Sequence, residues 1–147
     1  MSGKVPGSEF RVQRCYICKM KAEKFEDLEI WQLSRELSRI VFEVSSKEPF
    51  SNDFRFRDQI RAAAGSVMDN IAEGFERGGN KEFLQFLYIS KSSCAEVRSQ
   101  SYRAFDQLYI TEGQRDNILQ KTDTIARKIS NLIHHLRETS YKGPKFE

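Results

Sequence analysis

The stretch DQIRAAAGSVMDNIAEG, residues 58–74, repeats its apolar side chains at the spacing of an α-helix. Four of them lie about one turn apart and share one face: Ile60, Ala64, Val67 and Ile71. At the last turn, Asn70, Glu73 and Gly74 crowd against the edge of that face. The pattern predicts a helix that packs against a neighbour. It leaves open whether the polar residues perform chemistry or hold the structure.

The same helical period continues through the chain from residue 25 onward, and no segment alternates as a strand would. It predicts four helices, at residues 25–46, 53–76, 80–109 and 112–138. Because the connections between them are short, each helix should run antiparallel to the next. The predicted fold class is therefore all-α, an antiparallel up-down-up-down four-helix bundle.

Two of the predicted helices carry long core rows. The row of the third helix runs from Phe83 to Leu108 and is small in its middle, which allows a neighbouring helix to approach closely. The row of the fourth runs from Ile118 to Leu136 in steps of four and three residues, which predicts packing at about +20°. Asn80, which follows two glycines, is expected to cap the third helix.

The chain has 147 residues, which suits one domain with a single core. Of its charged residues, 1–24 hold six Lys/Arg and two Asp/Glu, and the remainder holds eighteen and nineteen. A bundle so close to neutral does not by itself indicate nucleic-acid binding. No apolar run reaches the ~18 residues of a membrane span, so no membrane partner is expected. Three cysteines, an odd count, fit a reducing cytoplasm better than a disulfide framework.

Residues 1–19 lack helical periodicity and are interpreted as a leader. Their segment GSEF, at 7–10, is what two adjacent common cloning sites encode, so a cloning scar is the favoured origin. The alternative is a genuine basic arm. The bundle is assigned to residues 20–141 and a C-terminal tail to 142–147.

Cys15 and Cys18 form a CxxC pair inside this leader. A structural zinc site needs four ligands. The other candidates are Cys94, which falls on a core face, and the adjacent His134 and His135, which point away from the apolar row of their helix. We therefore expect neither a metal nor a cofactor.

A second stripe follows the third predicted helix, on the side away from its core row. Its members are Leu84, Tyr88, Ala95, Tyr102 and Tyr109. A four-helix monomer has no fifth helix to cover this stripe, and tyrosine is enriched at protein interfaces. We interpret the stripe as an oligomer interface. The alternative is that the tyrosines lie singly at the surface with their hydroxyls in water.

A polar row borders the apolar face of the second helix. It comprises Gln59, Ser66, Asn70 and Glu73, and Glu96 lies in a matching row on the third helix. If the two helices pair across the double-glycine turn, Gln59 should lie near Glu96 and Ser66 near Ser90. No histidine, metal set or nucleophile shares the row, so we interpret it as a structural seam rather than an acid–base pair. No enzyme activity and no small-molecule substrate are expected.

Three segments of the chain resemble one known family. They are FEDLEIW at 25–31, DQIRAAAGSVMDNIAEG at 58–74 and EFLQFLYISKSSCAE at 82–96. Together they are similar to the four-helix-bundle proteins encoded in intervening sequences of bacterial 23S ribosomal RNA genes, over about residues 22–137. The resemblance implies a homopentamer around a central channel, with no established enzymatic activity. Cys94 and the leader depart from the family pattern.

The resemblance also bears on partners. A related bundle, the accessory protein of diversity-generating retroelements, makes a similar pentamer and binds nucleic acid and a reverse transcriptase through basic surfaces. By analogy, we expect RNA or another nucleic acid as a partner here. The expected contacts, repeated around the axis of an assembly, are Arg55, Arg57, Arg61, Arg77 and Lys81. The alternative is a protein-interaction scaffold for an unidentified partner.

Overall fold

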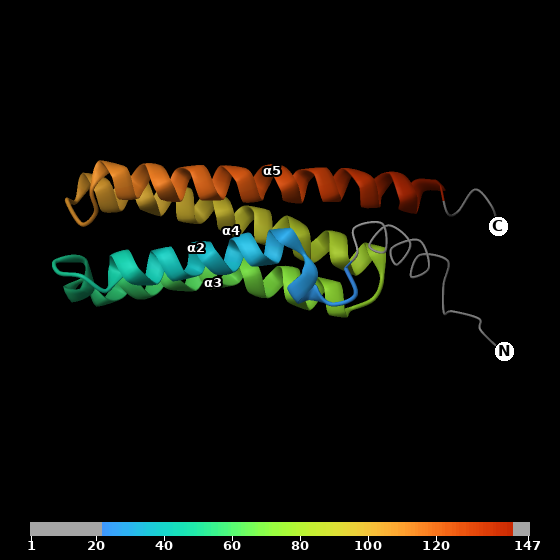
Figure 1. The fold of residues 1–147 in the computed structure, drawn as a ribbon, viewed down its shortest axis with the longest axis horizontal. Helices are drawn as coiled ribbons and strands as arrows, with labels where there is room; N and C mark the ends of the chain where they lie inside the picture. The colour runs from blue at the N-terminus through green and yellow to red at the C-terminus, as the bar shows by residue number, and fades with distance from the viewer. Residues whose placement is uncertain (1–21, 143–147) are drawn as a thin grey trace.

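A computed structural model describes residues 22–142 of the chain. The expected leader with its CxxC pair, and the tail beyond Lys142, lie outside this range. The described part forms two short 3₁₀ helices and four α-helices (Figure 1). In chain order these are η1 (Phe25–Asp27), α2 (Glu29–Ser45), η2 (Phe50–Asn52), α3 (Phe54–Glu76), α4 (Asn80–Asp106) and α5 (Glu112–Lys142).

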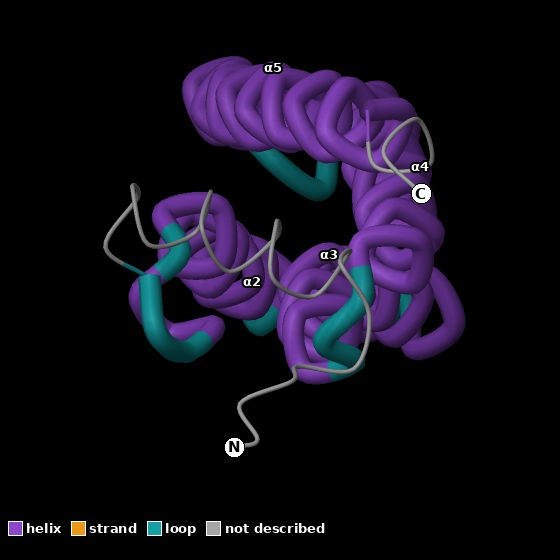
Figure 2. The backbone as a smooth tube through the Cα atoms, turned by 90° about the vertical axis from the view of Figure 1, so that its right-hand side faces the viewer, coloured by secondary structure: helices purple, strands orange, loops and turns teal. Residues whose placement is uncertain are grey.

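The four α-helices lie side by side, and the connections between them fall at alternating ends of the molecule (Figure 1). Each helix contacts the next in the chain, and α2 also contacts α5, so the four surround one core (Figure 2). The predicted four-helix bundle is therefore confirmed. Within residues 22–142, no helix has both the length and the apolar composition that crossing a membrane requires.

The apolar rows predicted for α3 and α5 are buried. Their buried members are Phe56, Ile60, Ala64, Val67 and Ile71 on α3, and Ile118, Thr122, Ile125, Ile129, Leu132 and Leu136 on α5. Burying a large aliphatic side chain contributes about 1.5–3 kcal/mol. These two rows therefore provide much of the driving force that holds the bundle together.

The first helix begins later than predicted. The Asp27 carboxylate accepts hydrogen bonds from the backbone N–H groups of Glu23 and Lys24, at 3.1 and 3.3 Å. These bonds close a separate 3₁₀ turn. Leu28 then adopts an extended backbone conformation, with its side chain buried, before α2 starts at Glu29.

The end of α4 also differs from the prediction. The helix stops at Asp106, and Leu108 adopts a left-handed conformation with φ of 62°. The N–H of Tyr109 donates to the carbonyl of Ala104 at 2.8 Å, and that of Leu108 donates to Phe105 at 2.9 Å. This is a Schellman motif, which turns the chain away from the helix axis. Leu108, predicted as a core residue, is consequently 82% exposed.

The cap predicted at the start of α4 is wrong. Asn80 is already the first helical residue and is buried. Gly79 occupies the N-cap position, and its carbonyl accepts the N–H of Phe83 at 3.0 Å. Gly78, with φ of 81°, makes the left-handed turn that glycine adopts at no steric cost.

A capping box begins α5. The Thr111 hydroxyl accepts the N–H of Gln114 at 3.1 Å, and the Gln114 side chain accepts the N–H of Thr111 at 2.9 Å. The helix then continues to Lys142, past the predicted end at 138. Its last turns project beyond the other helices (Figure 1).

Candidate interaction surfaces

Two residues of the predicted polar seam, Ser66 and Asn70 of α3, form hydrogen bonds where this helix packs against α4. The hydroxyl oxygens of Ser66 and Ser93 lie 2.9 Å apart. The Asn70 amide donates to the carbonyl and the hydroxyl of Ser66, at 2.7 and 2.9 Å. Nearby, the Ser90 hydroxyl donates to the carbonyl of Val67 at 2.7 Å. Because these groups bond to one another, the seam satisfies buried polar atoms and fixes how the helices pair.

The other three members of the predicted seam lie elsewhere. Glu73 is exposed and pairs with an arginine one turn along α3 at 2.9 Å. Glu96 accepts a hydrogen bond from Gln100 on its own helix at 3.3 Å. Gln59 accepts from Arg103 at 3.1 Å, so its predicted proximity to Glu96 is wrong. Glu73 and Glu96 therefore have different partners.

Gly74 allows α3 and α4 to approach closely. A Cβ atom on this buried glycine would lie 2.6 Å from the Cβ of Phe86 and 3.0 Å from the ring of Phe83. Only glycine permits so close an approach of helix backbone. Along the same pair of helices, Ser66 bonds to Ser93, and the predicted neighbour Ser90 bonds to the carbonyl of the adjacent Val67.

The cysteine of the described bundle lies in the core, whereas its two histidines lie at the surface. Cys94 is buried, and burial raises the pKa of its thiol to about 12, so the nucleophilic thiolate is not formed near neutral pH. His134 and His135 are exposed on α5, and His134 lies 3.3 Å from the carboxylate of Glu138. Within residues 22–142, no group of three or more His, Cys, Asp or Glu side chains could hold a metal ion.

The outer face of α4 keeps large side chains in solvent. Tyr88 and Tyr102 are 45% and 47% exposed, and Ala95 between them is exposed as well. Leu84 is only partly buried and packs against the core. Tyr109 lies beyond the end of α4, so its predicted place on this stripe is wrong.

Tyr109 instead joins the two connections at one end of the bundle. Its ring stacks on Phe50, with centroids 5.0 Å apart, and its hydroxyl donates to Asp53 at 2.9 Å. The other oxygen of Asp53 accepts the N–H of Phe56 at 3.2 Å and caps α3. The hydrogen bond to Asp53 raises the pKa of Tyr109, and burial and the Asp53 charge act in the same direction.

Two cations share the outer face of α4, and the sequence interpretation had missed them. Lys91 and Arg98 are exposed, each three residues after a member of the predicted stripe. No ion pair between described residues uses either side chain. The resulting α4 row consists of Tyr88, Lys91, Ala95, Arg98 and Tyr102. The spacing of three and four residues would have revealed it if polar residues had been counted with the apolar ones.

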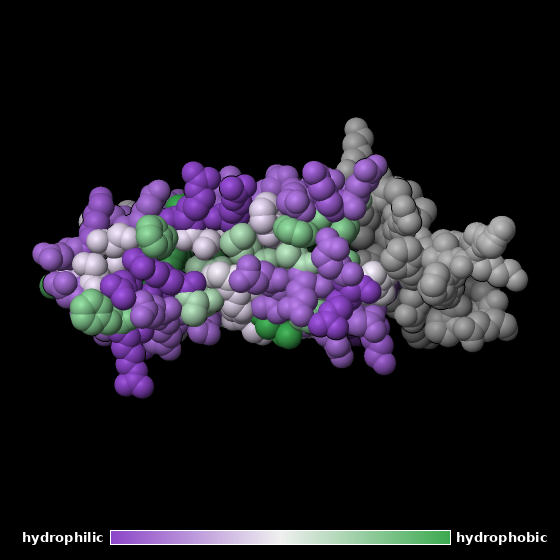
Figure 3. All heavy atoms as spheres, turned by 90° about the horizontal axis from the view of Figure 1, so that it is seen from below, coloured by the Kyte–Doolittle hydropathy of each residue, from purple (hydrophilic) through white to green (hydrophobic). Residues whose placement is uncertain are grey.

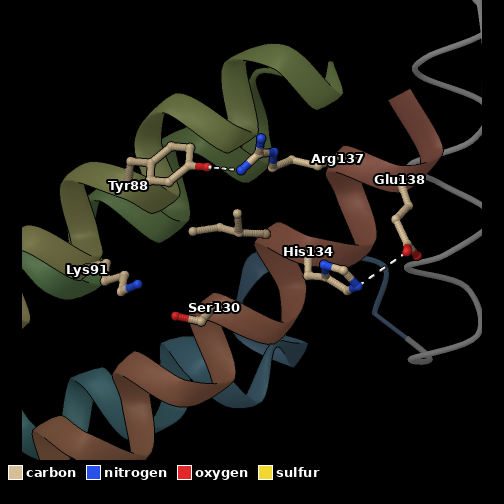
Figure 4. Close-up of a pocket in the computed structure, with 7 residues that line it drawn as sticks. Tyr88, Lys91, Ser130, His134, Arg137 and Glu138 are labelled. Atoms are coloured by element: carbon tan, nitrogen blue, oxygen red, sulfur yellow. Dashed lines mark hydrogen bonds and ion pairs between the residues drawn. The ribbon is translucent and has the colours of Figure 1, made fainter. Parts of the chain in front are cut away.

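Beside the α4 row, a hollow of about 660 Å³ lies between α4 and α5 (Figure 4). Arg137 of α5 donates to the Tyr88 hydroxyl at 3.3 Å along one edge, and Lys91 and Ser130 line another. The ion pairs of the described range include neither Lys91 nor Arg137. The carboxylate of Glu138, which also lines the hollow, interacts with a histidine of its own helix. The hollow is therefore lined by two cations that form no ion pair with described residues, and by one carboxylate.

The five cations predicted to bind nucleic acid do not form one surface. Arg55, Arg57 and Arg61 lie in the first turns of α3, whereas Arg77 and Lys81 flank the turn between α3 and α4. Arg57 and Arg77 are twenty residues apart on this helix, which corresponds to about 30 Å. The predicted set is thus divided between opposite ends of the bundle.

The cations at the first end cover two exposed aromatic rings. The Arg57 guanidinium lies 4.9 Å from the ring centre of Phe54, and Arg61 lies 4.4 Å from that of Phe42. Arg57 also pairs with Asp58 at 2.9 Å. Phe54 is 64% exposed and Phe42 is 57% exposed. On the face that α2 and α3 form, hydrophobic residues appear as small patches among hydrophilic ones (Figure 3).

The sequence and the fold were compared with those of known proteins. The profile of the family described as 23S rRNA-intervening sequence protein matches residues 26–131. A crystal structure of a protein with unknown function from the S23 ribosomal protein family of Bacteroides thetaiotaomicron has a TM-score of 0.65 and 22% sequence identity. The match covers 71% of this chain and 97% of that chain, and at this identity it shows a shared fold.

The comparison with curated proteins gave no match. The profile match, however, extends over well more than half of the chain and includes α2, α3 and α4 in full. These are the helices that carry the seam, the close contact at Gly74 and the exposed row. This protein therefore belongs to the 23S rRNA-intervening sequence protein family.

Proposed function

We propose that this protein is a non-enzymatic helical bundle that functions as a homo-oligomer, assembled through the outer face of α4. The observation that supports this most directly is the exposure of Tyr88 and Tyr102, 45% and 47%, on the outer face of α4. Tyrosine contributes a large apolar area together with a polar group and is enriched at interfaces. The expected number of copies, five, comes from the family resemblance.

An assembly of this kind would present each surface feature once per copy. Contacts too weak to hold a partner singly become effective when several copies act together. The proposed role is therefore that of a multivalent binding body.

Light scattering of the purified full chain tests the assembly. We expect a mass that is a multiple of the 17.2 kDa chain at micromolar concentration. Tyr88→Glu and Tyr102→Glu should each lower that mass, because a buried unpaired carboxylate opposes association. Glu112→Lys, at an exposed position of α5, serves as the control and should leave the mass unchanged. A parent protein of 17.2 kDa would refute the proposal.

RNA binding is a second candidate function, and the first end of α3 favours it. Arg57 and Arg61 lie over exposed phenylalanine rings, and single-stranded nucleic acids are often bound by cations combined with aromatic side chains. The name of the family also refers to 23S rRNA, which makes a structured RNA the first probe to use. An oligomer would repeat this pair of arginines around its axis.

Filter binding to a structured RNA at two salt concentrations tests this candidate. Binding should weaken with salt, with a slope of about 0.7 per single-strand phosphate contacted. It should be lost in the variant with Arg57→Glu and Arg61→Glu. The variant with Arg127→Glu and Lys128→Glu, which carries the same charge change on α5, should still bind.

A chain without residues 1–19 separates the helical surface from the leader. This truncation removes four basic residues and one acidic residue, which leaves twenty of each. Binding through α3 should survive it, whereas binding through a basic arm should fall sharply. If the truncated chain binds no RNA at low salt, the protein-interaction scaffold becomes the favoured function.

A further inference from the structure

The α4 row defined above has the composition of one half of an interface. Its two tyrosines, two cations and central alanine are all exposed, and they follow one another by three, four, three and four residues. That spacing keeps the five side chains on one side of the helix. Neither cation forms an ion pair with a described residue. A complementary surface would offer carboxylates, and small residues to receive the tyrosine rings.

The outer side of α3 offers such a surface. The residues concerned, called the α3 row here, are Ala62, Gly65, Asp69, Ala72 and Glu76. They are spaced by three, four, three and four residues, like the α4 row, and lie on the side of α3 away from its buried positions. Asp69 and Glu76 are exposed, and no ion pair formed between described residues uses them.

Gly65 lies on this side of α3, beside open space. A Cβ atom added there would meet only the carboxylate of Asp69, at 4.0 Å, whereas at Gly74 it would collide with a neighbouring helix. The chain's own packing therefore requires glycine at position 74 but not at position 65. A glycine inside a helix destabilises it relative to alanine. A second molecule that packs closely against α3 here would explain why position 65 is a glycine.

The two rows also match in length and in the separation of their charges. Lys91 and Arg98 are seven residues apart, and so are Asp69 and Glu76, which places each pair about 10.5 Å apart. Each complete row spans fourteen residues, or about 21 Å.

This match holds for both relative directions of the helices. When the opposite charges are aligned, one tyrosine of the α4 row falls within one residue of Gly65 in either direction. In either direction Ala95 also falls within one residue of Ala72. One tyrosine therefore meets a glycine, and the two alanines let the helices approach, where carboxylates meet cations.

We infer that the α4 row of one copy docks onto the α3 row of a second copy, with tyrosine over glycine and cations beside carboxylates. This inference rests on the proposed self-assembly and identifies the two surfaces that make it. The partner is a second copy of the chain. Its α3 row supplies the negative charge that the α4 row lacks, and a glycine and alanines against which a tyrosine can pack.

The alternative, in which two α4 rows meet across a two-fold axis, is electrostatically poor. An antiparallel pair of these rows centred on Ala95 brings Lys91 of one copy within a turn of Arg98 of the other, and like charges in an interface oppose association. In the proposed contact, each copy uses two different surfaces. These surfaces lie on two adjacent helices, α3 and α4 (Figure 2). The contact is therefore head-to-tail and forms a closed ring wherever the rotation between copies permits.

Charge reversal of each row tests the inference in the full chain. One variant carries Asp69→Lys with Glu76→Lys, and the other carries Lys91→Glu with Arg98→Glu. Each alone should have the 17.2 kDa mass of a single chain by light scattering, at concentrations where the parent assembles. The matched controls are Glu43→Lys with Glu48→Lys, and Arg39→Glu with Lys47→Glu. These four positions are exposed on α2 and the connection after it, and both controls should assemble like the parent.

Mixing the two reversed variants gives the decisive result. One variant then has two basic rows and the other two acidic rows, so a basic row always finds an acidic one. Native mass spectrometry of isotope-labelled samples should show mixed assemblies containing both variants. If both variants are folded by circular dichroism and the mixture still contains single chains only, the proposed pairing of the rows is wrong.

Gly65→Gln tests the contact without changing charge. The side chain has open space in the chain's own fold, so the variant should fold, and its larger volume should displace a docked tyrosine and lower the assembly mass. Gly113→Gln is the matched control, because this glycine on α5 is also in open space, with Thr111 its nearest neighbour at 4.0 Å. Assembly of the Gly65 variant like the parent would overturn the inference.

The outcomes separate the two proposals. A parent chain that is always a single 17.2 kDa species overturns the proposed assembly itself. A parent that assembles, with α3 variants that assemble equally well, overturns only the head-to-tail contact and leaves α4 as a surface that meets its own copy.

Discussion

At the scale of single residues, Asp53 shows how one side chain can position two segments. One of its oxygens caps α3, and the other accepts the hydroxyl of Tyr109, which follows α4. The periodic pattern placed Tyr109 on the outer stripe, because a helix extended by three residues would carry it there. The hydrogen bond and the stacking on Phe50 instead draw it inward. Partners so distant in the sequence leave no periodic signal.

Tyr109→Phe should lower the melting temperature by an amount that depends on pH. The pKa of the folded phenol is raised above its ordinary value of 10.0. The stabilisation from the neutral, bonded hydroxyl is therefore complete below pH 10 and is lost as pH rises through the folded pKa. The difference between parent and variant should be constant from pH 7 to 9 and shrink above pH ~10. A difference that grows with pH would contradict the assigned bond.

Asn70 and Glu73 provide a matched pair in the same turn of α3. Asn70→Leu removes the donor that serves Ser66 and should lower the free energy of unfolding by about 1–3 kcal/mol. Glu73→Ala removes only an exposed ion pair and should change it by less than about 0.5 kcal/mol. Urea unfolding at one protein concentration measures both. If the two variants are equally destabilised, the division of the seam described above is wrong.

At the scale of helices, the sequence predicted where apolar faces lie better than where helices end. The rows of α3 and α5 needed only the helical period, which the chain keeps throughout. The ends depend on hydrogen bonds that close individual turns, such as those of Asp27 and of Tyr109. The free-energy difference between closing such a turn and continuing the helix is small. The close approach of α3 and α4 depends on Gly74, because a Cβ atom there would collide with Phe86.

Two glycines of α3 should respond oppositely to alanine. Gly74→Ala forces apart helices whose atoms would otherwise lie 2.6 Å from the new Cβ, and should cost about 1–3 kcal/mol. Gly65→Ala meets open space and should stabilise the isolated fold by about 0.5–1 kcal/mol. Unfolding is best compared under conditions where both variants are dissociated, because association adds to apparent stability. Destabilisation by Gly65→Ala under those conditions would show an internal neighbour at that position.

The turn after α4 offers a second prediction at this scale. Leu108 has a positive φ, and its side chain is mostly exposed, so the residue is strained and contributes little to the core. Leu108→Gly should raise the free energy of unfolding by about 0.5–1 kcal/mol, because glycine adopts this conformation without strain. Leu108→Ala keeps the strained geometry and is the control. A loss of stability in the glycine variant would mean that the leucine side chain makes a contact in the folded assembly.

At the scale of the whole molecule, the period and the short connections were sufficient to predict the bundle, because four amphipathic helices have few ways to bury their faces. The candidate surfaces were harder to find. The tyrosines of α4 were visible as a stripe, but Lys91 and Arg98 between them were not counted. Arg137, which completes the hollow, comes from another helix and is brought there only by the fold. The predicted cations are divided between the two ends of the bundle, because the length of α3 separates Arg57 from Arg77.

Self-association is the central claim, and sedimentation equilibrium of the full chain over a dilution series tests it most directly. The proposed assembly predicts a mass that is a multiple of 17.2 kDa at the highest concentrations, and five copies are expected. It also predicts that the assembly dissociates on dilution, so that the mass falls toward that of one chain. The Tyr102→Glu variant should dissociate at a higher concentration than the parent. A mass of 17.2 kDa at every concentration, for the parent and the variant alike, would contradict it.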